Sequence, residues 1–208
     1  MGAPLTEKRK RSIATGRIFL IRHGKPEFPY SNEPRRWIWG SEFNRLSSQY
    51  DQSSLNPHWN RQRLEKHNPD IIASIQDSHP LSSDLIRARE TATLILGPSS
   101  EVKSMPLFRE VPLPTVPHFL RLPAYWHLYL ARLLWYAGKS SAEPKAEARK
   151  RARRAADVLE DHESRHPVSL FSHGFFLYML THELMRRGWQ CEHTRPMRYL
   201  EIRTFRKP

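Results

Sequence analysis

Ile18-Phe19-Leu20-Ile21-Arg22-His23-Gly24 is the stretch of the sequence that decides the fold. Its apolar residues predict a short strand buried on both faces, as in the middle of a parallel sheet. A second stretch, Val168-Ser169-Leu170-Phe171-Ser172-His173-Gly174, has the same design of an apolar strand ended by histidine and glycine. Ligands of open α/β sheets bind beyond the carboxyl ends of the strands. If the two strands are parallel neighbours, His23 and His173 lie side by side there, and the glycines allow a sharp turn close to a bound anion.

The rest of the chain alternates strands with helices. Helices are predicted over residues 84–96, 124–137, 144–166 and 175–187, and further strands over residues 80–83, 101–105 and 199–205. Residues 26–67 are predicted to be largely irregular, and so are the proline-rich residues 106–123. This order predicts an α/β fold: a three-layer sandwich with a mainly parallel central sheet flanked by helices, plus an aromatic-rich helical insertion. We expect a basic, disordered tail over residues 1–16 and a single domain over residues 17–208, with the insertion at about residues 111–143.

Composition limits the partners and the compartment. The formal net charge of the 208 residues is +13, but it is concentrated in residues 8–11 and 145–154, which carry no interleaved aromatic residues. We therefore expect no nucleic-acid partner; a positive surface also attracts phosphorylated small molecules. No transmembrane segment or secretory signal is expected, because no apolar run is long enough and none follows the basic residues at the start. The single cysteine, Cys191, excludes an internal disulfide and favours a cytoplasmic location.

Three motifs, in order, resemble those of the histidine phosphatase superfamily, the phosphoglycerate-mutase-like enzymes. Leu20-Ile21-Arg22-His23-Gly24 is similar to the family's Arg-His-Gly signature. Residues 82–92, with Arg87 before an alanine, resemble the second motif, and Phe171-Ser172-His173-Gly174 resembles the late motif with the second histidine. Together they cover essentially the whole chain after the tail. The resemblance implies the α/β sandwich already expected and a phosphorylated small-molecule substrate.

The resemblance also implies a role for each motif residue. His23 would be the nucleophile that forms a covalent phosphohistidine, and Arg22 and Arg87 would bind the phosphoryl oxygens through charge and a planar fork of donors. His173 would be largely protonated and would donate to the transferring oxygens as negative charge spreads over them. This scheme needs no metal and no cofactor.

A proton donor for the leaving oxygen is expected from a carboxylic acid after the strand that follows the second motif. Phe108-Arg109-Glu110-Val111 occupies that place, so the resemblance implies Glu110 as general acid. The alternative is an exposed glutamate that merely pairs with Arg109.

The sequence departs from the family pattern in three respects. Familiar members follow Arg-His-Gly with Glu-Thr and then a phosphate-holding asparagine, whereas this chain continues with Lys25-Pro26-Glu27-Phe28. The usual glycine and glutamate after the acid are replaced by Pro112-Leu113-Pro114, and the long substrate-covering insertion of the mutases is not evident. These departures favour a phosphatase over a mutase.

In place of that insertion lies the aromatic-rich stretch of residues 111–138. It is interpreted as a lid over the active site, as extra core, or as an interfacial helix that contacts a membrane or a partner. For the whole chain the leading hypothesis is a phosphomonoesterase. The alternatives are a phosphoglycerate-mutase-type phosphotransferase and a non-catalytic module that binds a phosphorylated ligand, and the oligomeric state stays open.

Overall fold

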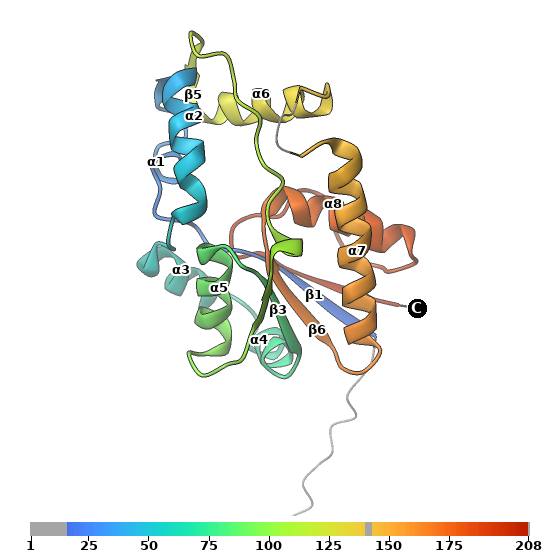
Figure 1. Ribbon diagram of the computed structural model, residues 1–208. Coiled ribbons are helices and arrows are strands. Elements are labelled where there is room, and N and C mark those ends of the chain that lie inside the picture. Colours follow the sequence, from blue (N-terminus) through green and yellow to red (C-terminus); the bar gives the residue numbers. More distant parts are fainter. Residues whose placement is uncertain (1–15, 140–142, 208) are drawn as a thin grey trace, which may run out of the picture.

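The structure is a computed structural model that describes residues 16–139 and 143–207, apart from the side chains of residues 30 and 31. The tail predicted for residues 1–16 therefore lies outside the described residues except for Gly16. Figure 1 shows the chain folded around one central sheet, with a smaller group of elements above it.

The central sheet has five strands in the order β4-β3-β6-β1-β7. They are β1 (Arg17–Arg22), β3 (His79–Ser83), β4 (Lys103–Met105), β6 (Val168–Ser172) and β7 (Ile202–Arg206). The neighbours β1, β6, β3 and β4 pair in parallel, and only the edge strand β7 is antiparallel. The predicted last strand therefore exists, but it begins three residues later than residue 199.

Helices cover both faces of the sheet, as the alternation of β1 side chains requires. Ile18 and Leu20 pack in a cluster with α7 (Lys145–Glu163) and α8 (Gly174–Arg186). Phe19 and Ile21 pack on the other face with α4 (Pro69–Gln76) and α5 (Ile86–Leu96). Figure 1 shows the two helical layers on either side of the strands. The structure thus confirms the predicted three-layer α/β sandwich.

A second, smaller core belongs to what we call the cap. It consists of β2 (Trp37–Trp39), α2 (Gly40–Gln49), β5 (Arg121–Pro123) and α6 (Ala124–Tyr136). The strands β2 and β5 form an antiparallel pair, and the cap buries a cluster of its own made of Ile38, Phe43, Val116, Ala124 and Ala131. Figure 1 shows these elements together at the top of the molecule.

The prediction that residues 26–67 are largely irregular was wrong. This stretch contains α1 (Pro29–Asn32), β2, α2, η1 (Tyr50–Gln52) and α3 (Pro57–Leu64). The start of α3 carries a readable signal, because Asn56 accepts a hydrogen bond from the Trp59 amide (2.8 Å) and Pro57 occupies the first helical position. The proline-rich residues 106–123 are mostly irregular, apart from the short η2 (Pro106–Phe108) and β5.

Candidate active site

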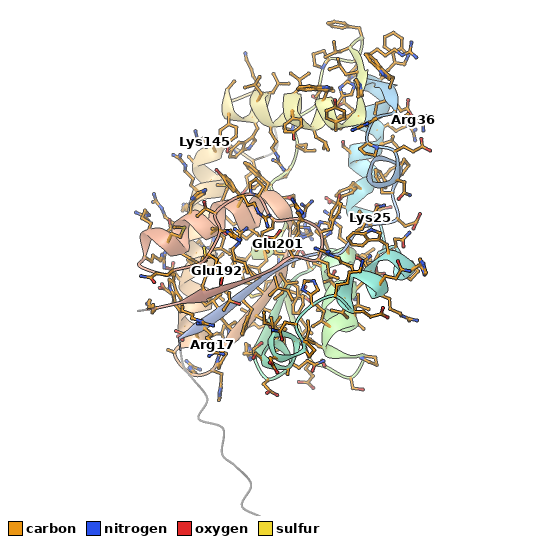
Figure 2. All side chains as sticks on the ribbon, turned by 180° about the vertical axis from the view of Figure 1, so that it is seen from behind. Arg17, Lys25, Arg36, Lys145, Glu192 and Glu201 are labelled. Atoms are coloured by element: carbon orange, nitrogen blue, oxygen red, sulfur yellow. The ribbon has the colours of Figure 1, made fainter. Side chains whose placement is uncertain are left out.

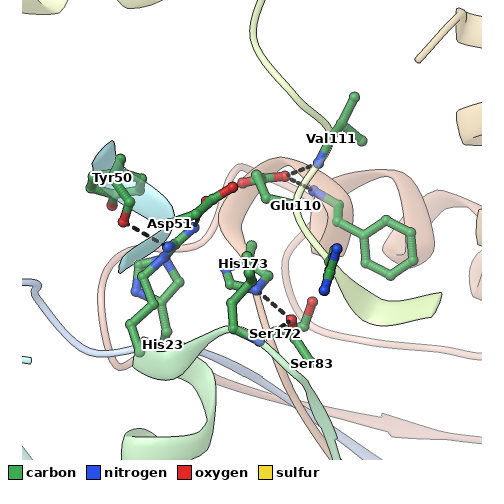
Figure 3. A network of polar contacts seen from close by, with 12 residues as sticks. His23, Tyr50, Asp51, Ser83, Glu110, Val111, Ser172 and His173 are labelled. Atoms are coloured by element: carbon green, nitrogen blue, oxygen red, sulfur yellow. Dashed lines mark hydrogen bonds and ion pairs between the residues drawn. The ribbon is translucent and has the colours of Figure 1, made fainter. Parts of the chain in front are cut away.

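The strand register places the two motif histidines together. In the parallel pair β1 and β6, Leu20 is opposite Leu170 and Arg22 is opposite Ser172. The next residues, His23 and His173, therefore leave the sheet at adjacent positions. Their ring centroids are 5.1 Å apart, and both side chains are buried, with 1% and 0% of their surface exposed. Figure 3 shows the two rings beside each other.

Hydrogen bonding fixes which nitrogen of His23 is available. Its Nδ1 lies 2.7 Å from the carbonyl oxygen of Gly24. Because a carbonyl oxygen only accepts, Nδ1 carries the proton and Nε2 keeps its lone pair. Burial, followed by the charges of Arg87 and Arg22, holds the pKa of His23 well below its ordinary value of 6.5. The ring is therefore neutral, which is the form that can act as a nucleophile.

The second histidine is held by strand β3. Its Nε2 lies 2.8 Å from the hydroxyl of Ser83. Burial, then His23, Arg87 and Arg22, hold the pKa of His173 well below 6.5 as well. A proton on His173 would face two guanidinium groups, so the protonated form that the resemblance implies is disfavoured unless an anion lies beside the ring. A bound phosphate dianion would raise the pKa of His173 again.

Arg22 is fixed from three sides. Its Nη1 donates to the carbonyl oxygen of Met197 (2.5 Å), and its guanidinium lies over the ring of Tyr199, 4.2 Å from the centroid. A Cβ atom on Gly174 would lie 2.9 Å from the Arg22 guanidinium carbon. Glycine at position 174 is therefore required by the close approach of Arg22. Its φ angle is not in the positive region, so the sharp turn predicted for this glycine is not the reason.

Arg87 is completely buried. Its Nη1 donates to the carbonyl oxygen of Tyr50 (2.9 Å), its Nη2 donates to the Asp51 carboxylate (3.0 Å), and its guanidinium lies over the Tyr50 ring. Burial, followed by the neighbouring Tyr199, raises the pKa of Tyr50, which keeps its phenol protonated. Figure 3 shows Tyr50 and Asp51 on the same side of the site as His23. In this structure the Asp51 carboxylate is the anion that Arg87 binds.

Three nitrogen atoms around the histidines lack partners. Among the described residues, Nε of Arg22, Nε of Arg87 and Nδ1 of His173 are buried and make no hydrogen bond. A buried polar atom without a partner is costly, so such atoms gather at sites that bind a ligand or water. The predicted phosphate-binding residues therefore retain unused hydrogen-bonding capacity.

Hydrogen bonds to the side chains of Thr91 and Asn60 hold the loop after His23 in place. The Gly24 amide donates to Thr91 Oγ1 (2.9 Å), and the Lys25 amide donates to Asn60 Oδ1 (2.7 Å). A Cβ atom on Gly24 would lie 2.2 Å from the same Asn60 oxygen, so this glycine too is required by a close approach. Asn60 is fully buried, and its side-chain nitrogen Nδ2 donates to the backbone carbonyl oxygens of Lys25 and Asn56.

Glu110 lies at the start of α8, next to His173. One carboxylate oxygen accepts from the amides of Val111 (2.9 Å) and Phe176 (2.8 Å), and the other accepts from the amide of Phe175 (3.0 Å). The Arg132 side chain reaches from the cap to within 4.0 Å of the same carboxylate. Figure 3 shows the Glu110 carboxylate above His173.

The alternative pairing of Glu110 with Arg109 is not found. Arg109 instead binds the carboxylate of Asp84 through both Nε (2.7 Å) and Nη2 (2.5 Å). Glu110 is free of that pair and points toward the first turn of α8.

The structure brings together all five residues that the sequence singled out and adds others. Sequence reasoning missed Tyr50, Asp51, Ser83 and Tyr199, which contact Arg87, His173 and Arg22. Ser83 carried a signal, since it ends a strand inside the second motif. Tyr50 and Asp51 carried none, because they lie in the stretch predicted to be irregular.

No metal centre or membrane span is present in the described part of the chain. No group of three His, Cys, Asp or Glu side chains within residues 16–139 and 143–207 could hold a metal ion. None of the helices over those residues is both long and apolar enough to cross a bilayer.

Comparison with known proteins shows the superfamily to which the chain belongs. The family model of the histidine phosphatase superfamily, branch 1, matches residues 18–205, and the chain belongs to this superfamily. No curated protein gives a significant match.

Solved structures share the fold at low sequence identity. A mycobacterial glucosyl-3-phosphoglycerate phosphatase is similar with a TM-score of 0.57 and 19% identity, over 91% of this chain and 89% of that one. A phosphoserine phosphatase from Entamoeba histolytica, solved with phosphoserine, has a TM-score of 0.57 and 20% identity over 90% and 89% of the two chains. The same enzyme solved with 3-phosphoglyceric acid has a TM-score of 0.56 and 19% identity, again over 90% and 89%.

Proposed function

We propose that the protein is a phosphomonoesterase that hydrolyses a phosphorylated small molecule through a phosphohistidine on His23. Membership of the histidine phosphatase superfamily supports this reaction class. The structural neighbours named above as phosphatases point in the same direction.

One observation carries the proposal: a buried, neutral His23 whose Nε2 keeps its lone pair between two arginines and a second histidine. A phosphate ester repels nucleophiles through its anionic oxygens. Arg22 and Arg87 offset that repulsion with fixed positive charge, while the low pKa of His23 keeps the attacking nitrogen unprotonated. The bound phosphate would also supply acceptors for the three buried nitrogens that lack partners.

In the first step Nε2 of His23 attacks phosphorus in line, and the bond between phosphorus and the ester oxygen breaks. The leaving oxygen takes a proton from Glu110. The proton on Nδ1 stays on that nitrogen and is donated in a hydrogen bond to the Gly24 carbonyl oxygen, which stabilises the positive charge on the phosphorylated ring. His173 accepts a proton as the phosphate binds and donates to the transferring oxygens.

In the second step water attacks the phosphohistidine. The Glu110 carboxylate takes a proton from that water, the bond between phosphorus and nitrogen breaks, and inorganic phosphate leaves. The second step thus returns to Glu110 the proton that it gave to the leaving oxygen in the first.

The cap is proposed to act as the lid of the site and to form the wall around the leaving group. Arg132 on α6 connects the cap to the acid, because its Nη2 donates to the Val111 carbonyl (2.9 Å) next to Glu110. Burial lowers the pKa of Arg132, and Glu110 is the first charge that opposes this effect. The reacting ester would therefore lie between the sheet edge and α6.

The test is a covalent trap with labelled substrate. We expect a phosphoenzyme that survives an alkaline quench and is lost in acid, as a phosphoramidate is, together with release of labelled inorganic phosphate. His23→Ala should lower hydrolysis of an aryl phosphate by about a thousandfold or more and abolish the label. The matched control is His58→Ala on the exposed face of α3.

Three outcomes would overturn the proposal. They are full activity of His23→Ala, no hydrolysis of a broad phosphoester panel by the wild type, or transfer of the label to an isomerised product without release of phosphate. The last outcome would identify a phosphotransferase of the mutase type.

A further inference from the structure

The cap and the loop before β5 expose large apolar side chains. Phe119 is 81% exposed, Tyr129 66%, Leu133 65% and Trp126 51%. Trp37 and Trp39 of β2 are exposed as well. A soluble domain rarely leaves such residues grouped in solvent, and a group of them marks a surface that meets an apolar partner.

Four of the exposed residues of α6 form one stripe. Trp126, Tyr129, Leu133 and Tyr136 follow at intervals of three or four, so they lie on successive turns of one helical face. The rings of Trp126 and Tyr129 are 5.8 Å apart. We call these four residues the aromatic stripe.

The opposite face of α6 is firmly anchored, so the aromatic stripe is presented outward. Ala124, His127, Ala131 and Trp135 are buried on that face. His127 places Nε2 3.1 Å from the Ile38 carbonyl and stacks on Phe43. The exposure of the stripe therefore follows from how α6 packs and cannot be relieved by rotating the helix.

The charge within residues 111–142 is of one sign. Residues 111–142 contain no aspartate and no glutamate, but they contain Arg121, Arg132 and Lys139. Glu110 and Glu143, which flank this stretch, are engaged by backbone amides and by Arg151. Figure 2 shows Arg36 and Lys145 near the two ends of α6. The whole chain carries a formal net charge of +13.

We infer that the cap docks on the surface of an anionic lipid bilayer, with the aromatic stripe in the headgroup region. Trp and Tyr, each with an apolar body and one polar group, suit that region, and Leu133 adds apolar area. Arg121 and Lys139 meet the negative lipid headgroups, and the absence of carboxylates from residues 111–142 lowers the repulsion that would oppose docking. The docking that we infer is peripheral, because it uses one face of α6 and the cations beside it.

The experiment uses the full chain and lipid vesicles of two compositions. One contains phosphatidylcholine alone, and in the other about a quarter of the lipid is phosphatidylserine. We expect sedimentation with the anionic vesicles at least about tenfold stronger than with the neutral ones, weakened by salt. Tryptophan emission should shift to shorter wavelength on binding, because Trp126 leaves water.

The variant Trp126→Ser/Tyr129→Ser/Leu133→Ser should weaken vesicle binding by about tenfold or more while keeping aryl phosphate hydrolysis in the absence of lipid. The control is Ile71→Ser/Ile86→Ser/Met185→Ser, which removes exposed apolar side chains from three other helices. It should bind vesicles like the wild type.

Several results would overturn the inference. They are no binding to anionic vesicles, equal binding by the stripe variant and the wild type, or binding that depends only on the cations of residues 8–11. Self-association of the wild type in solution that the stripe variant abolishes, without vesicle binding, would instead assign this face to a second copy of the chain.

Discussion

The imidazole ring of His173 lies with its centroid 5.1 Å from that of His23, and the two ring planes are tilted by 54°. This arrangement follows from the register of β1 and β6, which ends both strands one residue before a histidine. It brings two buried imidazoles close to each other and to two guanidinium groups. A proton on either ring is disfavoured there, and this has a measurable consequence for stability.

The free energy of unfolding should fall as the pH drops below about 6.5. The pKa values of His23 and His173 are held well below 6.5 in the folded chain, so the unfolded chain binds more protons in that range. Stability is therefore fully present above the unfolded pKa and is lost as the pH falls, by up to about 1.4 kcal/mol per pH unit for each histidine. Urea unfolding at pH 7 and pH 5.5 measures this loss.

His173→Asn separates this effect from that of other histidines. The pKa values of His67, His79 and His162 are also lowered by burial, so the wild type alone does not assign the slope. The variant should lose less stability between the two pH values than the wild type. An unchanged pH dependence would mean that His173 titrates normally in the folded chain.

Gly174→Ala should damage the site through Arg22. The new Cβ would lie 2.9 Å from the guanidinium and displace it, so we expect kcat/KM to fall by about a hundredfold. In an Arg22→Ala background the same change should cost nothing further, and it should slightly stabilise α8, because alanine is the better helix former. Steady-state kinetics and thermal melts of the two single variants and the double variant test this. Additive losses would contradict it.

Much of this fold and site could be predicted because it rests on local patterns. The apolar residues before Arg22 and before Ser172 define two buried strands, and parallel pairing then fixes where the histidines meet. The function of Gly174 could not be predicted correctly. The sequence suggested a turn, whereas the cause is a contact with a side chain distant in the chain, which no local pattern encodes.

The contact between the Asp51 carboxylate and Arg87 could not be predicted either. Nothing near position 51 indicates a site, and only the packing of η1 against α5 brings this carboxylate to Arg87. The lowered pKa of His173 could not be predicted for a related reason. It depends on burial and on two arginines from other strands and helices, and these are visible only once the chain has folded.

Asp51→Asn should tighten the binding of inorganic phosphate. The Asp51 carboxylate holds Nη2 of Arg87 at 3.0 Å and competes with the phosphate for it. Removing its charge while keeping an acceptor should lower the inhibition constant of phosphate about threefold to tenfold, most at low ionic strength. Asp161→Asn, which breaks an exposed pair with Arg165 on α7, is the control and should change nothing. Weaker phosphate binding would show that Asp51 is needed to position Arg87.

Glu110→Gln should affect substrates according to their leaving groups. An alkoxide needs a proton as it departs, so hydrolysis of alkyl phosphates should fall by about a hundredfold or more. A nitrophenolate needs little help, so hydrolysis of its ester should fall by less than about tenfold. Rates for a series of phosphate esters, plotted against the pKa of the leaving group, should show a steeper dependence for the variant than for the wild type.

The same substitution also touches the fold, and this must be kept apart from catalysis. The Glu110 carboxylate accepts three backbone amides, two of them at the first turn of α8, and a glutamine amide cannot accept with both ends. Stability should therefore drop by about 1 kcal/mol, as for the loss of a helix cap. Asp84→Asn breaks the exposed pair with Arg109 and should leave the leaving-group dependence unchanged. A Glu110→Gln variant that slows all esters equally would show that the carboxylate only holds α8, and the proton would then have to come from another group.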